Sequence, residues 1–237
     1  MKPYTIKSYT TIELTEQDAV ATVHLHWPDA GQLSQALLSD LVQLMDDLED
    51  ESDCTLIVFQ GLSTPQPSVG SAPPSLDQCS KWEKFLLRLE RFAGASIACI
   101  DGFCTRFQFQ LALTCDYRLA TSRSVFQAPE VKEGYLPGMG VFRLAKYTGL
   151  GVARRFLFTS AQWSAAEATA LGILDRQCEV TTLAKAIEEA QHALMPIHPE
   201  VLLNVRRLLN ESFATSFEDA IGHFLAAQNL CLAKLSR

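Results

Sequence analysis

Apolar segments with the spacing of strands and of helices alternate along most of the chain. Residues 10–14 and 19–26 are rich in apolar and β-branched side chains, and the polar residues between them predict a β-hairpin. From Ser34 the apolar residues recur at helical spacing, which predicts a helix with a solvated acidic end at residues 46–51. Leu56–Phe59 has the composition of a short buried strand, so a βαβ unit follows the hairpin.

A second βαβ unit lies between residues 96 and 140. Ile97–Ile100 and Tyr117–Ala120 are apolar strand segments, and the residues between them carry the apolar face of a crossover helix. A third short segment, Val125–Gln127, leads to Pro129-Glu130 and to a loop with three glycines that opens the next helix. A functional site is therefore expected between the start of the crossover helix and Glu130.

Helices dominate the rest of the chain. Residues 62–80 are rich in Pro, Ser and Gly and predict an irregular loop, whereas residues 81–92 predict a strongly amphipathic helix. A helix interrupted near Gly149 follows residue 140, and Ser164 with Glu167 forms a capping-box sequence at the start of another.

Length and composition indicate one large α/β domain with a helical tail. We expect an α/β core over residues 1–180 and a C-terminal helical region over residues 181–237. The net charge of −7, with scattered basic residues, argues against a nucleic-acid partner. The seven cysteines lack metal-ligand spacing and predict reduced thiols in a cytoplasmic protein. No uncharged apolar run approaches the roughly 20 residues that cross a bilayer, so no membrane association is expected.

The central motifs resemble those of the crotonase superfamily, which comprises the enoyl-CoA hydratases and isomerases. In that family the corresponding segments read NGYALGGGCELALACD and FGQPEIxLGxxPGxGG. The positions that match without a gap are Gly102-Phe103, Leu111-Ala112-Leu113, Cys115-Asp116, Phe126 to Glu130, Gly134 and Pro137-Gly138. The run from Ser164 to Cys178 is also similar to the family segment SAxEAxxxGLVxxV.

The resemblance implies an α/β fold with a crotonase-like ββα spiral core and a C-terminal helical region that serves in trimerisation or as a lid. It also implies a homotrimer or hexamer that acts on an acyl thioester. Coenzyme A or phosphopantetheine is then part of the substrate, and no metal, flavin or nucleotide redox cofactor is expected.

Glu130 occupies the position of the family glutamate that works as general acid or base at the α or β carbon of the thioester. Burial can bring the pKa of such a carboxyl toward neutrality, although a surface carboxylate beside a turn is the alternative. Gln110 stands where hydratases of the family usually have a second glutamate. A glutamine can orient water or substrate but cannot take a proton, so we expect hydration or dehydration with one glutamate. One-base isomerisation and decarboxylation stay open.

The three glycines that open the family's helix are replaced by bulkier residues, with Arg106 at the first position and Phe107 at the second. In the family the second position donates an N–H group to the oxyanion hole. Phe107 retains this backbone group, although its ring can obstruct the thioester. The other donor is expected at Val69. Arg106 either binds a carboxylate or phosphate or lies at the surface, and Glu133 and Tyr135 either assist the chemistry or serve the packing of their loop.

Recognition of coenzyme A is poorly marked, because no Lys or Arg occurs between Lys7 and Lys81, where the family commonly has a basic residue. A carrier-protein thioester would tolerate this loss. Residues 81–92 and 216–230 are similar to the auxiliary hydratase of the dihydroxyphenylglycine pathway, which implies polyketide-type secondary metabolism and a partner polyketide synthase.

The rival hypothesis is a non-catalytic crotonase-like subunit that assists a partner enzyme. A pocket filled by the rings of Phe107 and Phe109 would favour the subunit. A pocket open between Glu130 and the N–H of Phe107 would favour the enzyme.

Overall fold

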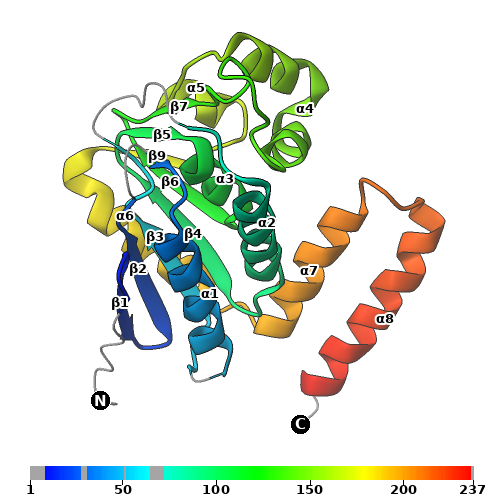
Figure 1. Cartoon of the computed structure of the whole chain (residues 1–237). Helices are drawn as coiled ribbons and strands as arrows, with labels where there is room; N and C mark the ends of the chain where they lie inside the picture. Colours follow the sequence, from blue (N-terminus) through cyan, green and yellow to red (C-terminus); the bar gives the residue numbers. More distant parts are fainter. Residues whose placement is uncertain (1–8, 28–30, 51, 65–71, 236–237) are drawn as a thin grey trace.

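The fold is built on a six-stranded sheet, in a computed structural model that describes residues 9–27, 31–50, 52–64 and 72–235 (Figure 1). Its strands, in spatial order, are β1 (Ile12–Gln17), β2 (Val20–Leu25), β3 (Leu56–Gln60), β4 (Ala95–Ile100), β6 (Tyr117–Thr121) and β9 (Arg176–Cys178). β1 and β2 form the predicted antiparallel hairpin, and the other neighbouring pairs are parallel. The carboxyl ends of β2 to β9 therefore share one edge, where open α/β sheets usually bind ligands.

A second, three-stranded sheet follows directly from this edge. It contains β5 (Phe103–Thr105), β7 (Val125–Gln127) and β8 (Trp163–Ser164), with β5 and β7 parallel and β7 and β8 antiparallel. The chain passes from β4 to β5 through Asp101 and Gly102. Gly102 has a φ of +133°, and a Cβ there would lie 2.8 Å from the carbonyl oxygen of Thr64, so the turn requires glycine.

Helices cover both faces of the large sheet (Figure 1). α1 (Gln35–Asp50), α2 (Leu76–Arg91) and α3 (Arg106–Thr114) pack with the main apolar core, and α6 (Leu183–Leu194) packs against β4 and β6. A smaller apolar cluster, to which α6 contributes Ala186 and Ala190, marks the second face. All nine residues of α3 are buried, so its first turn lies inside the molecule.

The remaining helices are α4 (Gly140–Thr159), α5 (Ala165–Ala170), α7 (Pro199–Glu211) and α8 (Phe217–Leu235), with a short 3-10 turn at Val180–Thr182. Arg206 attaches α7 to the core, because its guanidinium pairs with Asp116 and donates to the carbonyl oxygens of Phe92 and Gly94. α8 runs alongside α7 at the periphery (Figure 1), with most of its described apolar side chains exposed. The trimer or hexamer, the lid role and the boundary at residue 180 stay predictions.

Two predicted local signals are confirmed. Gly149 interrupts α4 with a φ of +74°, and Ser164 and Glu167 form a complete capping box at the start of α5. All seven cysteines are free thiols. Within the described residues, no helix combines the length and apolarity needed to cross a membrane.

One predicted boundary is wrong. The chain becomes helical at Leu76, inside the segment 62–80 that was predicted to be irregular. Ser75 accepts a hydrogen bond from the N–H of Gln78, whose side chain accepts one from the N–H of Ser75. This capping box starts α2 a full turn before the apolar periodicity begins, because Leu76 is exposed and does not belong to the buried face.

Candidate active site

The pairing of β5 with β7 brings two distant segments of the chain together. Thr105, the last residue of β5, pairs with Gln127, the last residue of β7. The residues that follow each strand therefore leave the small sheet side by side. α3 begins with Arg106 immediately after β5, and Glu130 follows β7 by three residues. The first turns of α3 consequently lie near the turn that carries Glu130.

Glu130 is a buried carboxyl with only 1% of its surface exposed, so the alternative of a surface carboxylate is wrong. Neither carboxyl oxygen has a hydrogen-bond partner in the described part of the chain. Burial raises the pKa of Glu130 to about 7, and the charge of Glu133 adds to this increase. The backbone of Glu130 itself, the charge of Arg106 and the nearby side chain of Gln110 oppose it. A carboxyl with a pKa near neutrality can both accept and release a proton at physiological pH.

Gln110 shares a small cavity with Glu130. The cavity has a volume of about 10 Å³, which is roughly the space for one water molecule. Oε1 of Gln110 accepts a hydrogen bond from the indole N–H of Trp82 at 3.0 Å, whereas Nε2 has no partner within the described residues. Two carboxyl oxygens and one amide nitrogen are thus buried and unpartnered beside a cavity that a single water or hydroxyl group would fill.

Arg106 has a fully buried side chain and a φ of +53°, a left-handed conformation that residues other than glycine seldom adopt. Its guanidinium pairs with Glu133 and donates to the hydroxyl of Tyr135. Burial alone would lower the pKa of Arg106, but hydrogen bonding to Glu133 reverses this effect and raises it, and the same contact lowers the pKa of Glu133. The predicted surface alternative for Arg106 is therefore wrong, and the carboxylate that it binds belongs to the protein itself.

A second pocket, of about 150 Å³, also borders Arg106, and its wall includes Phe107, Gln78 and Tyr135. The ring of Phe107 packs edge-on against Trp82, with ring centroids 5.4 Å apart. Phe107 is the second residue of α3, where a backbone N–H has no partner within the helix. Val69, the other expected oxyanion donor, lies outside the described residues.

Aromatic rings line both pockets. Phe109 borders the inner cavity and packs on Phe126 and Phe156, each at a centroid distance of 5.7 Å. Phe107 borders the outer pocket. Phe107 borders only the outer pocket and Glu130 only the inner cavity, whereas Arg106 lines both. Among the described residues, neither space joins Glu130 to Phe107 as the enzyme hypothesis expects, so the choice between enzyme and subunit at this site stays a prediction.

Residues 15–229 match the family model for enoyl-CoA hydratase/isomerase. The chain belongs to the enoyl-CoA hydratase/isomerase family. An enoyl-CoA hydratase of Amycolatopsis orientalis is 31% identical over 208 residues, which cover 86% of this chain and 93% of that protein. A short-chain enoyl-CoA hydratase of Clostridium acetobutylicum is 23% identical over 231 residues, which cover 93% of this chain and 88% of that protein.

Solved structures share the fold over nearly all of the chain. Enoyl-CoA hydratase subunit I of Geobacillus kaustophilus superposes with a TM-score of 0.82 at 25% identity, covering 96% of this chain and 91% of that one. A Thermobifida fusca protein solved in complex with acetoacetyl-CoA has the same TM-score at 22% identity and covers 94% of this chain and 95% of that one. The predicted crotonase fold and the assignment to crotonase-type enzymes are confirmed, whereas the similarity to the auxiliary hydratase stays a prediction.

Within this enoyl-CoA hydratase/isomerase fold, Trp82 is the site residue that sequence reasoning missed. Its spacing with Phe85 and Leu89 places it on the apolar face of α2, and it is indeed buried there. The signal that could have distinguished it is chemical, because a buried indole N–H needs an acceptor. Nothing in the sequence indicates that Gln110 supplies it.

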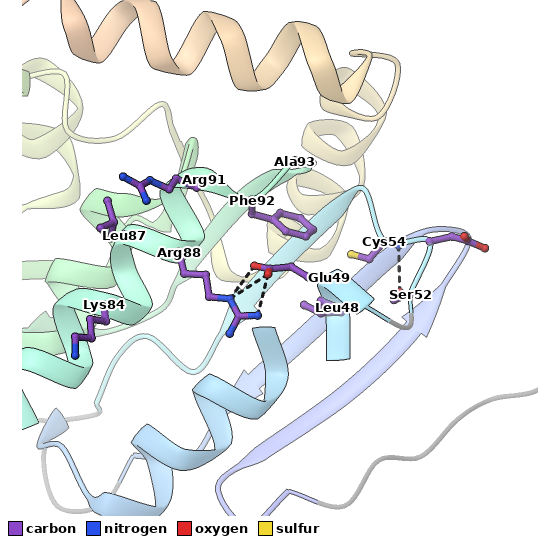
Figure 2. A pocket seen from close by; sticks show the side chains of 11 residues that line it. Leu48, Glu49, Ser52, Cys54, Lys84, Leu87, Arg88, Arg91, Phe92 and Ala93 are labelled. Atoms are coloured by element: carbon purple, nitrogen blue, oxygen red, sulfur yellow. Dashed lines mark hydrogen bonds and ion pairs between the residues drawn. The ribbon is translucent and has the colours of Figure 1, made fainter. Parts of the chain in front are cut away.

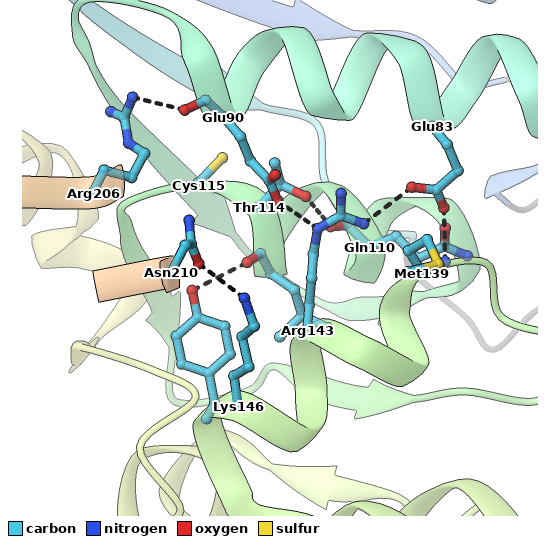
Figure 3. Close-up of polar contacts among 12 residues, drawn as sticks. Glu83, Glu90, Gln110, Thr114, Cys115, Met139, Arg143, Lys146, Arg206 and Asn210 are labelled. Carbon is cyan, nitrogen blue, oxygen red and sulfur yellow. Dashed lines mark hydrogen bonds and ion pairs between the residues drawn. The ribbon is translucent and has the colours of Figure 1, made fainter. Parts of the chain in front are cut away.

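Two larger cavities lie elsewhere in the enoyl-CoA hydratase/isomerase fold, and Glu130 borders neither. One, of about 680 Å³, lies at the amino end of β3, where Arg88 is bound by Glu49 (Figure 2). The other, of about 800 Å³, lies between α2, α4 and α7, where Arg143 pairs with Glu83 (Figure 3). These arginines are already neutralised by carboxylates, so the smaller cavity at Glu130 is the better candidate for acid–base chemistry.

Proposed function

We propose that the protein adds water to an enoyl thioester, or removes it from a 3-hydroxyacyl thioester, with Glu130 as the one acid and base. The observation that carries this proposal is the cavity where the unpartnered carboxyl of Glu130 and the amide of Gln110 border the space for one water. A pKa of about 7 at Glu130 supports it, because the group can then act in both protonation states.

The proposed addition needs a single proton carrier. The carboxylate of Glu130 takes one proton from the water while the oxygen bonds to the β carbon, and the electron pair of the double bond moves toward the thioester carbonyl. The resulting enolate takes the same proton back from Glu130 at its α carbon. Gln110 donates a hydrogen bond to the water but exchanges no proton, so both hydrogens and the oxygen of one water end in the product.

The charge that develops on the thioester oxygen requires hydrogen-bond donors. We assign this role to the backbone N–H groups of Phe107 and Val69, as the family resemblance implies. The position of Phe107 in the first turn of α3, where a backbone N–H has no partner within the helix, supports the first of these donors.

The substrate is proposed to be an acyl thioester of coenzyme A or of a carrier protein, with no further cofactor. The Thermobifida fusca complex with acetoacetyl-CoA supports the first form. The lining of the outer pocket supports the carrier-protein thioester, which lacks the adenine nucleotide of coenzyme A. Arg106 is the only cation among the described residues of this lining, and it is already paired with Glu133. The proposal also includes a homotrimer or hexamer and a partner polyketide synthase in polyketide-type secondary metabolism, which rest on the resemblance alone. A cytoplasmic location rests on the pattern of the cysteines.

Double-bond isomerisation is the second candidate function. Gln110 favours it, because a glutamine cannot serve as the second base of a two-carboxylate hydratase, whereas one carboxyl suffices to move a proton between two carbons of an enoyl thioester. The same argument extends to decarboxylation only if the substrate carries a carboxylate.

The test is turnover of a panel of enoyl, 3-hydroxyacyl and 3-enoyl thioesters, each supplied as the coenzyme A and the pantetheine form. If the protein is a hydratase, the absorbance of the conjugated enoyl thioester should decrease with time. The rate of this decrease should be at least about 100-fold lower in Glu130→Ala. Glu188→Gln, at an exposed carboxylate on α6, is the matched control and should turn over like the wild type.

The outcomes separate the hypotheses. Conversion of 3-enoyl to 2-enoyl thioesters without hydration would replace the hydratase by the isomerase. No turnover of any panel member by the wild type would leave the non-catalytic subunit as the better interpretation.

A further inference from the structure

Trp82 makes a hydrogen bond that fixes which end of the Gln110 amide faces the catalytic cavity. Its indole N–H donates to Oε1 of Gln110 at 3.0 Å, and both side chains are buried. An indole nitrogen can only donate, so the amide oxygen must turn toward Trp82. The amide nitrogen of Gln110 then turns away from the indole, and it has no partner in the described part of the chain.

The indole of Trp82 is itself held by packing. Its ring lies 5.4 Å from that of Phe107, 5.5 Å from that of Phe85 and 6.1 Å from that of Trp27, measured between centroids. Only 1% of Trp82 is exposed. The direction of its N–H therefore follows from the apolar core and not from Gln110.

The glycine loop that contains Gly138 and Gly140 also lies close to the Gln110 side chain. A Cβ placed on Gly138 would lie 2.6 Å from Oε1 of Gln110, and one on Gly140 would lie 3.3 Å from its Cγ. A side chain at either glycine would therefore crowd the Gln110 side chain. The glutamine has little space for another rotamer, and rotation of its amide end is the remaining freedom.

We propose that Trp82 is a positioning residue of the hydration reaction, which keeps the N–H and not the carbonyl of Gln110 directed at the reacting water. This inference rests on the proposed function. With the amide in this orientation the water accepts a hydrogen bond from Gln110, and both of its protons remain available to Glu130. A flipped amide would accept one of these protons and compete with Glu130 for the water.

The experiment is a double-mutant cycle of Trp82→Phe and Gln110→Met, with kcat and KM measured on the best enoyl thioester of the panel. Trp82→Phe keeps an aromatic ring but removes the N–H, so kcat should fall roughly 3- to 10-fold, as expected for one hydrogen bond, while KM stays within about twofold. Gln110→Met has no amide to orient. Adding Trp82→Phe to it should therefore change kcat no further.

A merely structural role of Trp82 gives a different result. It predicts that Trp82→Phe lowers kcat equally in both backgrounds, which would overturn the proposal, as would a change confined to KM. Phe92→Leu, at the buried far end of α2 in the wall of the cavity beside Arg88, is the control for loss of a buried aromatic ring and should leave kcat close to that of the wild type.

An activity-independent measurement separates this proposal from the proposed function. The indole proton of Trp82, observed by nitrogen-15 NMR, should shift upfield in Gln110→Met because it loses its acceptor. An unchanged resonance overturns the contact between Trp82 and Gln110. Absence of wild-type turnover overturns the hydration, and with it the positioning role, even if the resonance moves.

Discussion

Replacement of Glu130 by glutamine should stabilise the folded protein at high pH while it abolishes turnover. In the folded protein the pKa of Glu130 is about 7, against an ordinary value of 4.5. At a pH between these two pKa values, Glu130 is protonated in the folded protein and ionised in the unfolded chain. The free energy of unfolding of the wild type therefore falls as the pH rises from the lower to the higher pKa. The cost of the buried charge is fully present above pH 7.

The magnitude follows from the two pKa values. Each unit of pKa difference corresponds to about 1.4 kcal/mol, so the burial of an ionised Glu130 costs on the order of 3 kcal/mol at pH 8. Glu130→Gln removes this titration. Its free energy of unfolding relative to the wild type should therefore rise by about that amount between pH 4 and pH 8.

The assay is denaturant unfolding followed by tryptophan fluorescence at fixed protein concentration, across pH 4 to 8. Glu218→Gln, at an exposed carboxylate of α8, should give a curve parallel to that of the wild type. If Glu130→Gln also runs parallel to the wild type, Glu130 does not ionise in a buried environment and the reasoning about its pKa fails.

Three further predictions concern the surroundings of Glu130. Gln110→Glu places a second carboxyl in the same cavity, so the acid limb of the pH–rate profile should move to higher pH; an unmoved limb would show that the two side chains do not interact. Arg106→Met removes a positive charge that lowers the pKa of Glu130, so the acid limb should move to higher pH. Glu133→Gln removes a negative charge that raises this pKa, so the limb should move to lower pH. Shifts of the two variants in the same direction would contradict this. Phe107→Ala should destabilise the fold by roughly 3 to 5 kcal/mol in denaturant unfolding, yet keep kcat within about tenfold because the backbone N–H remains; a far larger loss of kcat would assign a role to the ring.

The strands and helices follow from the sequence wherever apolar periodicity is strong. The hairpin at residues 10–26, the helix from Ser34 and the βαβ unit around α3 all have such periodicity, and the structure contains each of them. The first turn of α2 escaped prediction because its capping box, Ser75 with Gln78, lies in a proline-rich segment and carries no buried apolar residue. Of the small sheet only β7 was predicted, as the short segment Val125–Gln127. The other two strands, β5 and β8, have three and two residues, which is too few for an apolar pattern to show.

The candidate site was predictable only where a family motif extends through it. Glu130 could be assigned from its register, but its burial and its missing hydrogen-bond partners depend on tertiary packing. Arg106 shows the limit most clearly, since an arginine in place of glycine indicates either a surface or an anion-binding position. Its actual partners, Glu133 and Tyr135, are more than twenty residues away and meet it only through the pairing of β5 with β7.

The most direct test of single-carboxyl catalysis is the pH dependence of kcat/KM for hydration of an enoyl thioester by the wild-type protein. This parameter reports the ionisation of the free enzyme. Hydration requires the carboxylate form of Glu130, so kcat/KM should rise with pH through a single limb near pH 7, and Glu130→Gln should show no measurable hydration. A profile that is flat between pH 5 and 8, or a Glu130→Gln variant that hydrates at the wild-type rate, would contradict the assignment of Glu130 as the acid and base.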